Sequence, residues 1–223
     1  MLIAGLQKTS MLDYPGKPCA VVFVPYCNMR CWYCHNEHIL TGDAELFDEG
    51  EVLSYLQKRS GMLKACVISG GEPTLQPGLI PFAEQVRAMG YLIKLDTNGT
   101  KPEVVRELIQ RKLIDYVAMD IKAGPTHYNE VTRTDCDLSA IKKSVFYLRN
   151  TGIDHEFRTT FAPTLTKEDI LEAAEMIAGT QHYYLQQYRQ RKDGDPEPHS
   201  PSYVRETADE VREKIGICTV RGI

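Results

Sequence analysis

The sequence of 223 residues predicts an α/β protein whose best description is an open, partial (β/α)6 barrel. Six short apolar segments have the character of strands, and segments with helical periodicity alternate with them. Strands that alternate with helices pair in parallel through right-handed crossovers. Six units are too few for a closed eight-stranded barrel. Polar motifs follow the strands, as is typical of barrels in which the chemistry collects at the carboxyl ends of the strands.

The predicted elements follow one another in a regular order. Strands are expected at residues 19–24, 65–69, 91–95, 116–119, 155–161 and 183–187. Helices are expected at residues 49–59, 78–89, 100–110, 138–150, 166–178 and 202–215. Asp48 and Thr166 are predicted N-caps, and Thr100 with Glu103 has the pattern of a capping box. Residues 217–220 are a candidate edge strand.

Composition indicates a single domain over residues 1–223, with a core at about 18–190 and a C-terminal helix and edge strand at 202–223. The apolar content of 43% and the charged content of 25% are ordinary for a globular protein. The net charge of −4 gives no sign of the basic surface with which proteins bind nucleic acids. The apolar runs are too short to span a membrane. An odd number of cysteines, seven, argues for a reducing cytoplasm rather than a disulfide framework.

Three of the cysteines lie close together, directly after the first predicted strand. Cys27, Cys31 and Cys34 form a C-x3-C-x2-C pattern with no fourth cysteine nearby. Three thiolates can hold three irons of one [4Fe–4S] cluster and leave the fourth iron open to a small molecule. The alternative is a zinc site that adds His35, although structural zinc sites usually consist of two spaced ligand pairs. The other four cysteines are expected to be buried structural thiols.

The pattern resembles the cluster motif of the radical S-adenosylmethionine superfamily, with Tyr33 as the aromatic residue before the last cysteine. The resemblance implies that S-adenosylmethionine binds the open iron and is reductively cleaved to a 5′-deoxyadenosyl radical. It also implies the partial barrel. One departure is visible: the family usually has glycine before the first cluster cysteine, where this chain has Tyr26.

Gly70-Gly71-Glu72-Pro73, after the second predicted strand, resembles the superfamily motif that contacts the amino group of the cofactor's methionine. Two glycines allow a close approach of the backbone, and Glu72 supplies a carboxylate for the amine. The alternative is a plain turn, since Gly-Gly and Glu-Pro are common turn dipeptides.

Two further stretches resemble the activating enzymes of glycyl-radical proteins. They are Asp96-Thr-Asn98-Gly, after the third predicted strand, and Met-Asp120-Ile-Lys122, after the fourth. The resemblance implies that these residues contact the cofactor and the substrate, with Asp96 and Lys122 as catalytic candidates. The two carboxylates are also candidates for holding a monovalent cation. The alternatives are a hairpin turn at Asn98-Gly and a solvated strand end at Asp120 and Lys122.

Arg158 lies within the fifth predicted strand, and an arginine there is costly unless it is paired. The resemblance implies that it approaches the cofactor. The alternative is an ion pair with Glu156 or another neighbour.

Residues 5–190 together resemble activating proteins of anaerobic ribonucleoside-triphosphate reductase, in a subgroup that is similar to pyruvate formate-lyase activating enzyme. The resemblance implies an oxidoreductase that forms a glycyl radical on a partner enzyme, with a flavodoxin or ferredoxin as electron donor. The alternatives are activation of pyruvate formate-lyase or another glycyl-radical enzyme, a small-molecule enzyme similar to deazapurine synthases, and a non-catalytic metal-binding module. The loop at residues 189–201 is either a connector or a contact surface for the partner.

Overall fold

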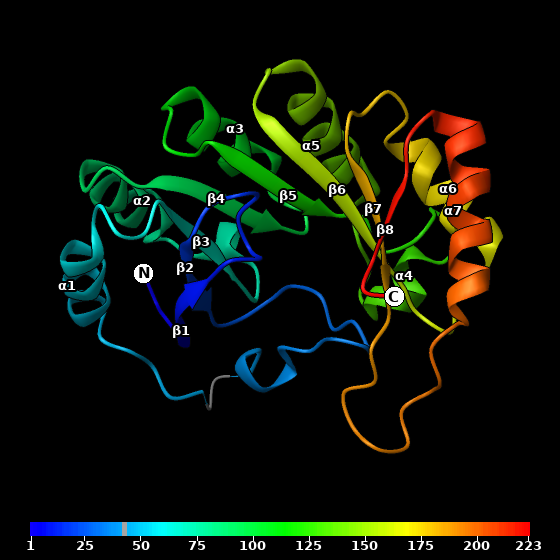
Figure 1. Ribbon diagram of the computed structural model, residues 1–223, viewed down its shortest axis with the longest axis horizontal. Coiled ribbons are helices and arrows are strands. Elements are labelled where there is room, and N and C mark those ends of the chain that lie inside the picture. The colour runs from blue at the N-terminus through cyan, green and yellow to red at the C-terminus, as the bar shows by residue number, and fades with distance from the viewer. Residues whose placement is uncertain (42–43) are drawn as a thin grey trace. The chain divides into compact units, whose positions relative to one another are not determined.

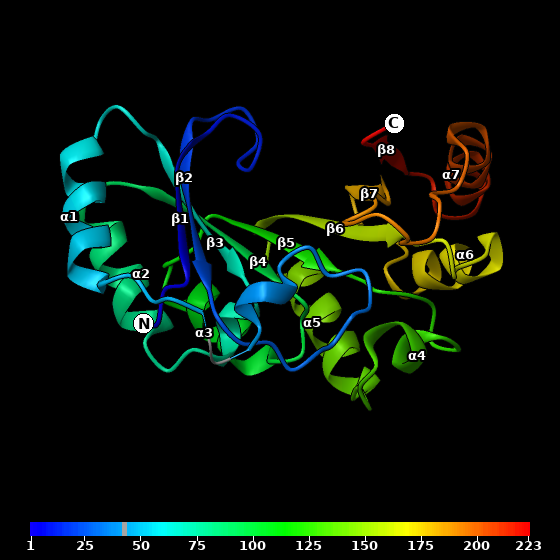
Figure 2. The same cartoon turned by 90° about the horizontal axis from the view of Figure 1, so that it is seen from below.

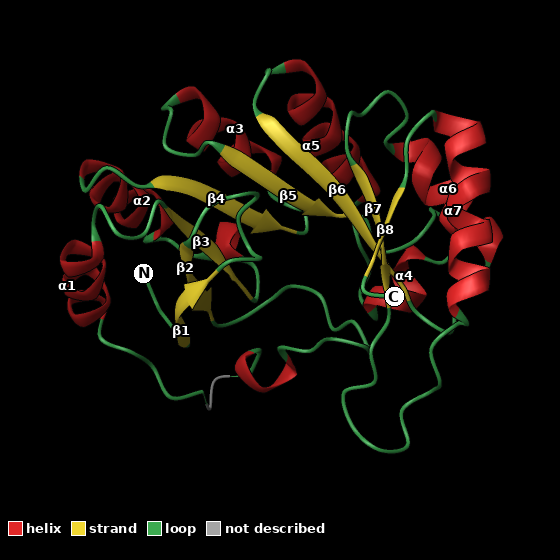
Figure 3. Cartoon of the chain, viewed as in Figure 1, coloured by secondary structure: helices red, strands yellow, loops and turns green. Residues whose placement is uncertain are grey.

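The computed structural model describes residues 1–41 and 44–223, which form two compact units (Figure 1). The first unit comprises residues 1–28, 36–97 and 101–117, and the second comprises residues 29–35, 98–100 and 118–223. Helices and strands alternate along most of the chain, as Figure 3 shows. The predicted α/β class with parallel strands is therefore confirmed, whereas the single domain stays a prediction.

Four complete strands lie in the described part of the first unit, and the pairing of the first two is antiparallel while the others are parallel. They are β1 (Gly5–Ser10), β2 (Cys19–Val24), β3 (Ala65–Gly70) and β4 (Leu92–Thr97). β1 pairs antiparallel with β2, while β2, β3 and β4 are parallel neighbours. β2 is buried along nearly its whole length, as the continuous apolar run predicts for a parallel strand covered on both faces.

The helices of the first unit connect these parallel strands. They are α1 (Glu49–Arg59), α2 (Leu79–Ala88) and α3 (Pro102–Gln110), with short 3₁₀ turns η1 (Glu37–Ile39) and η2 (Pro73–Leu75). The side chain of Asp48 accepts a hydrogen bond from the backbone N–H of Glu51 at 2.9 Å and caps α1, as predicted. α1 buries Val52 and Leu56 from its apolar face.

The second unit has parallel strands covered by a helix pair. β5 (Tyr116–Asp120) begins in the first unit and ends in the second, which continues with β6 (Asp154–Phe161), β7 (Tyr183–Gln187) and β8 (Thr219–Arg221). Its helices are α4 (Tyr128–Thr132), α5 (Leu138–Asn150), α6 (Lys167–Met176) and α7 (Pro201–Ile215). β7 is parallel to both β6 and β8. Figure 2 shows α6 and α7 side by side, and these two helices contact one another.

Among the elements that differ from the prediction are β1, β8 and the short helix α4, for which the sequence predicted no helix. Residues 5–10 were assigned no element from the sequence, but they form β1. Its central residues are exposed, so no run of apolar residues marks it as a strand, and its pairing with β2 is what defines it. The edge strand predicted at residues 217–220 exists as β8, which begins two residues later and ends one residue later than predicted.

The capping box predicted at Thr100 is wrong. The backbone N–H and the hydroxyl of Thr100 both donate to Oδ1 of Asn98, at 3.1 Å and 2.7 Å. This local turn uses Thr100, so α3 begins one residue later, with Lys101 as N-cap and Pro102 in its first turn. At Thr166, by contrast, both arms of a capping box with Asp169 are present.

Candidate active site

The loop that carries the first motif cysteine is held tightly against the loop that follows β3. Tyr26 has a φ of 66°, in the left-handed region that favours glycine. The backbone N–H of Glu72 donates to the carbonyl of Tyr26 at 2.7 Å. A Cβ on Gly71 would lie 1.9 Å from that carbonyl oxygen. Tyr26 thus has a backbone geometry that favours glycine. The second glycine of the Gly-Gly pair is needed for this approach between two loops of the chain.

The other two motif cysteines lie in a short turn of the second unit. The backbone N–H of Cys34 donates to the carbonyl of Cys31 at 3.1 Å. The ring of Trp32 packs against Tyr188, with ring centroids 5.6 Å apart. Arg191 lies beside this turn, with Nη1 3.5 Å from the carbonyl oxygen of Cys34. Through Arg191 the loop at residues 189–201 therefore contacts the cysteine motif, and its role as connector or partner surface stays a prediction.

The thiols of the motif differ from most of the other cysteines in exposure. Cys27, Cys31 and Cys34 are partly exposed. Cys19, Cys66 and Cys218 are buried, which confirms the structural interpretation for these three; Cys136, however, is partly exposed. Burial raises the pKa of the Cys66 thiol to about 12 and that of Cys218 to about 11, so both stay protonated and are poor metal ligands.

Among residues 1–41 and 44–223, no three His, Cys, Asp or Glu side chains gather closely enough to hold a single metal ion. A [4Fe–4S] cluster makes a different demand, because each thiolate binds a separate iron. The chemistry of the donor set, three partly exposed thiols in one motif, fits such a cluster.

Glu72 is buried and its carboxylate is already engaged within the first unit. Its exposed fraction is 1%. Oε1 accepts hydrogen bonds from the N–H of Thr74 at 3.1 Å, the hydroxyl of Thr74 at 2.5 Å and the hydroxyl of Thr97 at 2.7 Å. Glu72 thus caps η2 and ties it to the end of β4. Through these contacts it shapes the loop, and its predicted contact with an amine stays a prediction.

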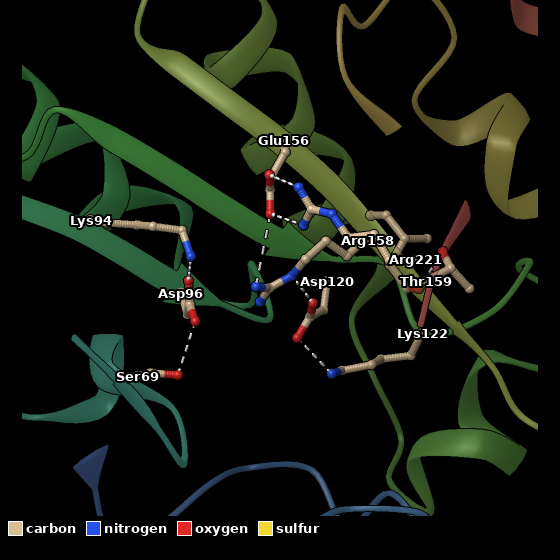
Figure 4. A network of polar contacts seen from close by, with 10 residues as sticks. Ser69, Lys94, Asp96, Asp120, Lys122, Glu156, Arg158, Thr159 and Arg221 are labelled. Atoms are coloured by element: carbon tan, nitrogen blue, oxygen red, sulfur yellow. Dashed lines mark hydrogen bonds and ion pairs between the residues drawn. The ribbon is translucent and has the colours of Figure 1, made fainter. Parts of the chain in front are cut away.

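Asp96 lies inside β4 rather than after it, and its two oxygens have different partners. Lys94 donates to Oδ1 at 2.7 Å and the hydroxyl of Ser69 donates to Oδ2 at 3.0 Å (Figure 4). Lys94 is only 3% exposed. A buried ammonium needs a counter-ion, so one role of Asp96 is to neutralise Lys94.

Asn98 forms the turn described above, in which its side chain accepts two hydrogen bonds from Thr100. Because this turn leads into α3 rather than back into an antiparallel strand, the alternative of a hairpin at Asn98-Gly99 is wrong. The predicted cofactor contact of Asn98 stays a prediction.

Asp120, Lys122 and Arg158 are brought together in the second unit. Arg158 Nε donates to Asp120 Oδ1 at 2.8 Å, and Lys122 Nζ donates to Oδ2 at 3.0 Å (Figure 4). Burial raises the pKa of Asp120, but the charges and hydrogen bonds of Arg158 and Lys122 outweigh it and hold that pKa well below its usual range. The three predicted residues therefore form one ion-pair group, with Asp120 and Lys122 at the end of β5 and Arg158 within β6.

Tyr33 is the aromatic residue of the cysteine motif. Its ring is 5% exposed, and its hydroxyl has no hydrogen-bond partner within the described part of the chain. Burial raises the pKa of Tyr33 well above its usual range, while the nearby charge of Lys122 opposes that shift. A buried phenol without a protein partner suits a site that a polar ligand completes.

Besides Ser69, which contacts Asp96, four residues with a place in such networks were missed from the sequence. They are Lys94, which contacts Asp96; Thr74 and Thr97, which both contact Glu72; and Arg221, which contacts Glu156. The lysine had a visible signal, because it interrupts the apolar strand at residues 91–95. The other three had none, because an isolated threonine or arginine has many uses.

The fold and the cysteine loop together define a class of iron–sulfur enzymes that use S-adenosylmethionine. The model of the Radical SAM superfamily matches residues 21–177, and the chain belongs to this superfamily. The protein is therefore a radical S-adenosylmethionine enzyme, and membership implies a [4Fe–4S] cluster and S-adenosylmethionine as its cofactors.

Relatives of this chain include activating enzymes. A provisionally assigned glycyl-radical enzyme activating enzyme of Methanocaldococcus jannaschii is 37% identical over 202 residues, which covers 88% of this chain and 83% of that protein. The pyruvate formate-lyase-activating enzyme of Clostridium pasteurianum is 32% identical over 78% of this chain and 75% of its own length. The 7-carboxy-7-deazaguanine synthase of Koribacter versatilis is 37% identical, over 40% of this chain and 39% of that protein.

Solved structures share the fold. Streptococcus suis SuiB bound to S-adenosylmethionine has a TM-score of 0.70 at 15% identity, covering 91% of this chain, which spans about half (52%) of the length of SuiB. A domain of pyruvate-formate lyase-activating enzyme from Bacteroides vulgatus has a TM-score of 0.58 at 20% identity, and covers 71% of this chain and 99% of that domain. These similarities confirm the α/β fold.

Proposed function

We propose that this protein is a glycyl-radical enzyme activating enzyme that cleaves S-adenosylmethionine reductively and abstracts a hydrogen atom from a glycine of a partner protein. The observation that carries the proposal is the group of Asp120, Lys122 and Arg158, whose first two members belong to the Met-Asp-Ile-Lys stretch typical of such enzymes. The two activating enzymes among the relatives each match more than three quarters of this chain.

In this proposal Cys27, Cys31 and Cys34 hold the cluster. The bound cluster supplies the electron that splits S-adenosylmethionine into methionine and a 5′-deoxyadenosyl radical. The protein's part is to bind and orient. Gly71 allows the loop after β3 to approach the loop that carries Cys27. Glu72 fixes the shape of the loop after β3.

The polar residues named above have complementary roles. Lys122 and Arg158 present positive charge in the second unit, where it suits the carboxylate of a methionine or the carbonyls of a peptide. The hydroxyl of Tyr33 is available to a ligand. Gly70, Asp96 and Asn98 are proposed cofactor contacts by the motif alone. The monovalent cation stays a prediction, and since Asp96 and Asp120 already pair with cationic side chains, little supports it.

The finer assignments rest on resemblance. The proposed partner is an anaerobic ribonucleoside-triphosphate reductase, the proposed electron donor is a flavodoxin or ferredoxin, and the proposed location is the cytoplasm. In the part of the chain that the structure describes, no helix has the length and apolar character needed to cross a bilayer.

A second candidate function is that of a small-molecule enzyme related to 7-carboxy-7-deazaguanine synthase. The observation in its favour is the 37% identity to the Koribacter versatilis enzyme. That similarity extends over only 40% of this chain, about half of the 78% and 88% that the two activating enzymes cover, so it ranks second.

The first test asks whether the reconstituted, reduced protein converts S-adenosylmethionine to 5′-deoxyadenosine, measured by mass spectrometry. Cys31→Ala should lose the cluster signal and all product. Cys136→Ala is the matched control, because Cys136 is also a partly exposed cysteine of the second unit, and it should retain both. Product from Cys31→Ala contradicts the assignment of the ligands.

The second test adds a candidate partner. Electron paramagnetic resonance should detect a glycyl radical when the reduced enzyme is mixed with S-adenosylmethionine and an anaerobic ribonucleotide reductase. A radical that forms only on pyruvate formate-lyase assigns that partner instead. Cleavage of S-adenosylmethionine with no radical on either protein favours the small-molecule alternative.

A further inference from the structure

Charged side chains of alternating sign form one continuous series in the second unit (Figure 4). The order is Lys122, Asp120, Arg158, Glu156 and Arg221, contributed by β5 with the residues that follow it, by β6 and by β8. The first three members belong to the proposed active site. The last two were assigned no role in it, and they lie at the opposite end of the series.

Glu156 and Arg221 form a bidentate ion pair. Nη1 of Arg221 donates to Oε1 of Glu156 at 2.9 Å, and Nη2 donates to Oε2 at 3.0 Å. The side chain of Glu156 is 2% exposed, whereas that of Arg221 is 38% exposed. A carboxylate buried this deeply is strongly unfavourable unless it is paired. Arg221 therefore compensates the charge of Glu156 through both of its oxygens.

Arg158 lies between two carboxylates and is closer to one of them. Its Nε donates to Asp120 at 2.8 Å, while its Nη1 lies 4.0 Å from Oε1 of Glu156. Residues 156 and 158 are two apart on one strand, so their side chains share a face of β6. If the charge of Glu156 were not compensated, its attraction would draw the guanidinium of Arg158 away from Asp120.

Arg221 is itself fixed by the strand that carries it. β8 is parallel to β7, with Arg221 opposite Gln186. The guanidinium carbon of Arg221 lies 3.2 Å from the centroid of the Tyr184 ring, a cation–π contact. β8 lies beyond residues 21–177, which the superfamily model matches. The residue that pairs with Glu156 thus lies outside the region that the superfamily model matches.

We infer that Arg221 is a positioning residue for the active site: by pairing with Glu156 it keeps Arg158 on Asp120, and so keeps Asp120 and Lys122 in place to receive the substrate or cofactor. The link to S-adenosylmethionine rests on the proposed function. The link from Arg221 to Arg158 does not, because it concerns only side chains of this chain.

The direct test observes Arg158 in the protein without any ligand. The Nε–H resonance of Arg158, assigned by its disappearance in Arg158→Lys, is followed by ¹H–¹⁵N NMR. Arg221→Gln should shift this resonance and speed its exchange with water, because the hydrogen bond to Asp120 opens. The double variant Arg221→Gln/Glu156→Gln should bring both back toward the wild-type values, because it removes the uncompensated charge.

A matched control separates charge from loosening of the strand. Arg212 donates to the carbonyl of Cys218 at 2.7 Å, directly before β8, so Arg212→Gln loosens this region without changing the partners of Glu156. It should leave the Arg158 resonance in place. The inference is overturned if Arg212→Gln acts like Arg221→Gln, if the double variant fails to recover, or if Arg221→Gln changes nothing. Should Arg221→Gln not fold, Arg221→Lys, which retains the charge, is expected to show a smaller shift.

Calorimetry with S-adenosylmethionine extends the test to the site. Arg221→Gln should weaken binding about tenfold, the effect of one charge-assisted contact, and the double variant should recover most of it. If the wild type does not bind S-adenosylmethionine, the proposed function fails while the NMR result still decides the inference. If the wild type and Arg221→Gln bind equally well, the inference fails and the proposed function stands.

Discussion

The buried and half-buried carboxylates of the first unit differ from those of the second in the kind of partner that holds them. Glu72 accepts hydrogen bonds from hydroxyl and backbone groups, and Asp96 pairs with one buried lysine. In the second unit Asp120 and Glu156 lie in a series that contains three cations. Dedicated neutral donors fix the shape of a loop, whereas shared charges can be redistributed when a charged ligand arrives. The second unit is accordingly the better place to respond to a substrate.

The largest effect on stability should come from Asp96→Asn. It leaves the ammonium of Lys94, whose side chain is 4% exposed, without its counter-ion, and breaking a buried pair in this way costs about 3–5 kcal/mol. Urea unfolding should show this loss. The double variant Lys94→Met/Asp96→Asn should recover most of the lost stability, because the unpaired ammonium of Lys94 is no longer present. If the double variant is as unstable as the single one, Asp96 does not stabilise the protein by neutralising Lys94.

A smaller loss is expected for Glu72→Ala. The variant deprives the N–H and hydroxyl of Thr74 and the hydroxyl of Thr97 of a buried acceptor, which should lower the free energy of unfolding by about 1–3 kcal/mol. Glu72→Gln retains an acceptor oxygen and should lose less. Equal losses in the two variants would mean that the charge of Glu72, rather than its hydrogen bonds, stabilises the loop.

Asp120→Asn should destabilise less again, by about 1.5 kcal/mol at neutral pH, because its partners are partly exposed and Arg158 also lies near Glu156. The pKa of Asp120 is lowered in the folded protein. Its contribution is therefore present above the unfolded pKa of about 3.9 and is lost as the pH falls through the lower, folded pKa. The difference between wild type and Asp120→Asn, measured by urea unfolding, should shrink below about pH 4. A difference that grows with acid would contradict the ion-pair assignment.

The smallest effect is expected at a peripheral charge contact of the second unit. His127 contacts Asp169, and the hydrogen bond and charge of that carboxylate raise the pKa of His127. Its contribution is present below the unfolded pKa of about 6.5 and is lost as the pH rises through the folded pKa. His127→Gln should therefore reduce the unfolding temperature at pH 6 by more than at pH 9. The same reduction at both values would show that the contact is not charge-dependent.

Local patterns were sufficient for most elements of the fold. The strand at Cys19–Val24 and the helix at Glu49–Arg59 have the predicted bounds, because a continuous apolar run and a capped amphipathic segment are signals contained in the residues themselves. β1 and the start of α3 were missed for the opposite reason. β1 is defined by pairing with β2, and a side chain two residues upstream of Thr100 competed for its hydroxyl.

By itself, the sequence determined the α/β class, the cysteine motif, the superfamily and the group of residues that includes Asp120, Lys122 and Arg158, since each depends on spacing along the chain. Only the tertiary structure decided which partner each charge has. The pairs Glu72–Thr97, Arg158–Asp120 and Arg221–Glu156 join residues 25, 38 and 65 positions apart. Such pairs form because folding places particular strands side by side and because a buried charge must find a partner there, and no local pattern encodes which partner that is.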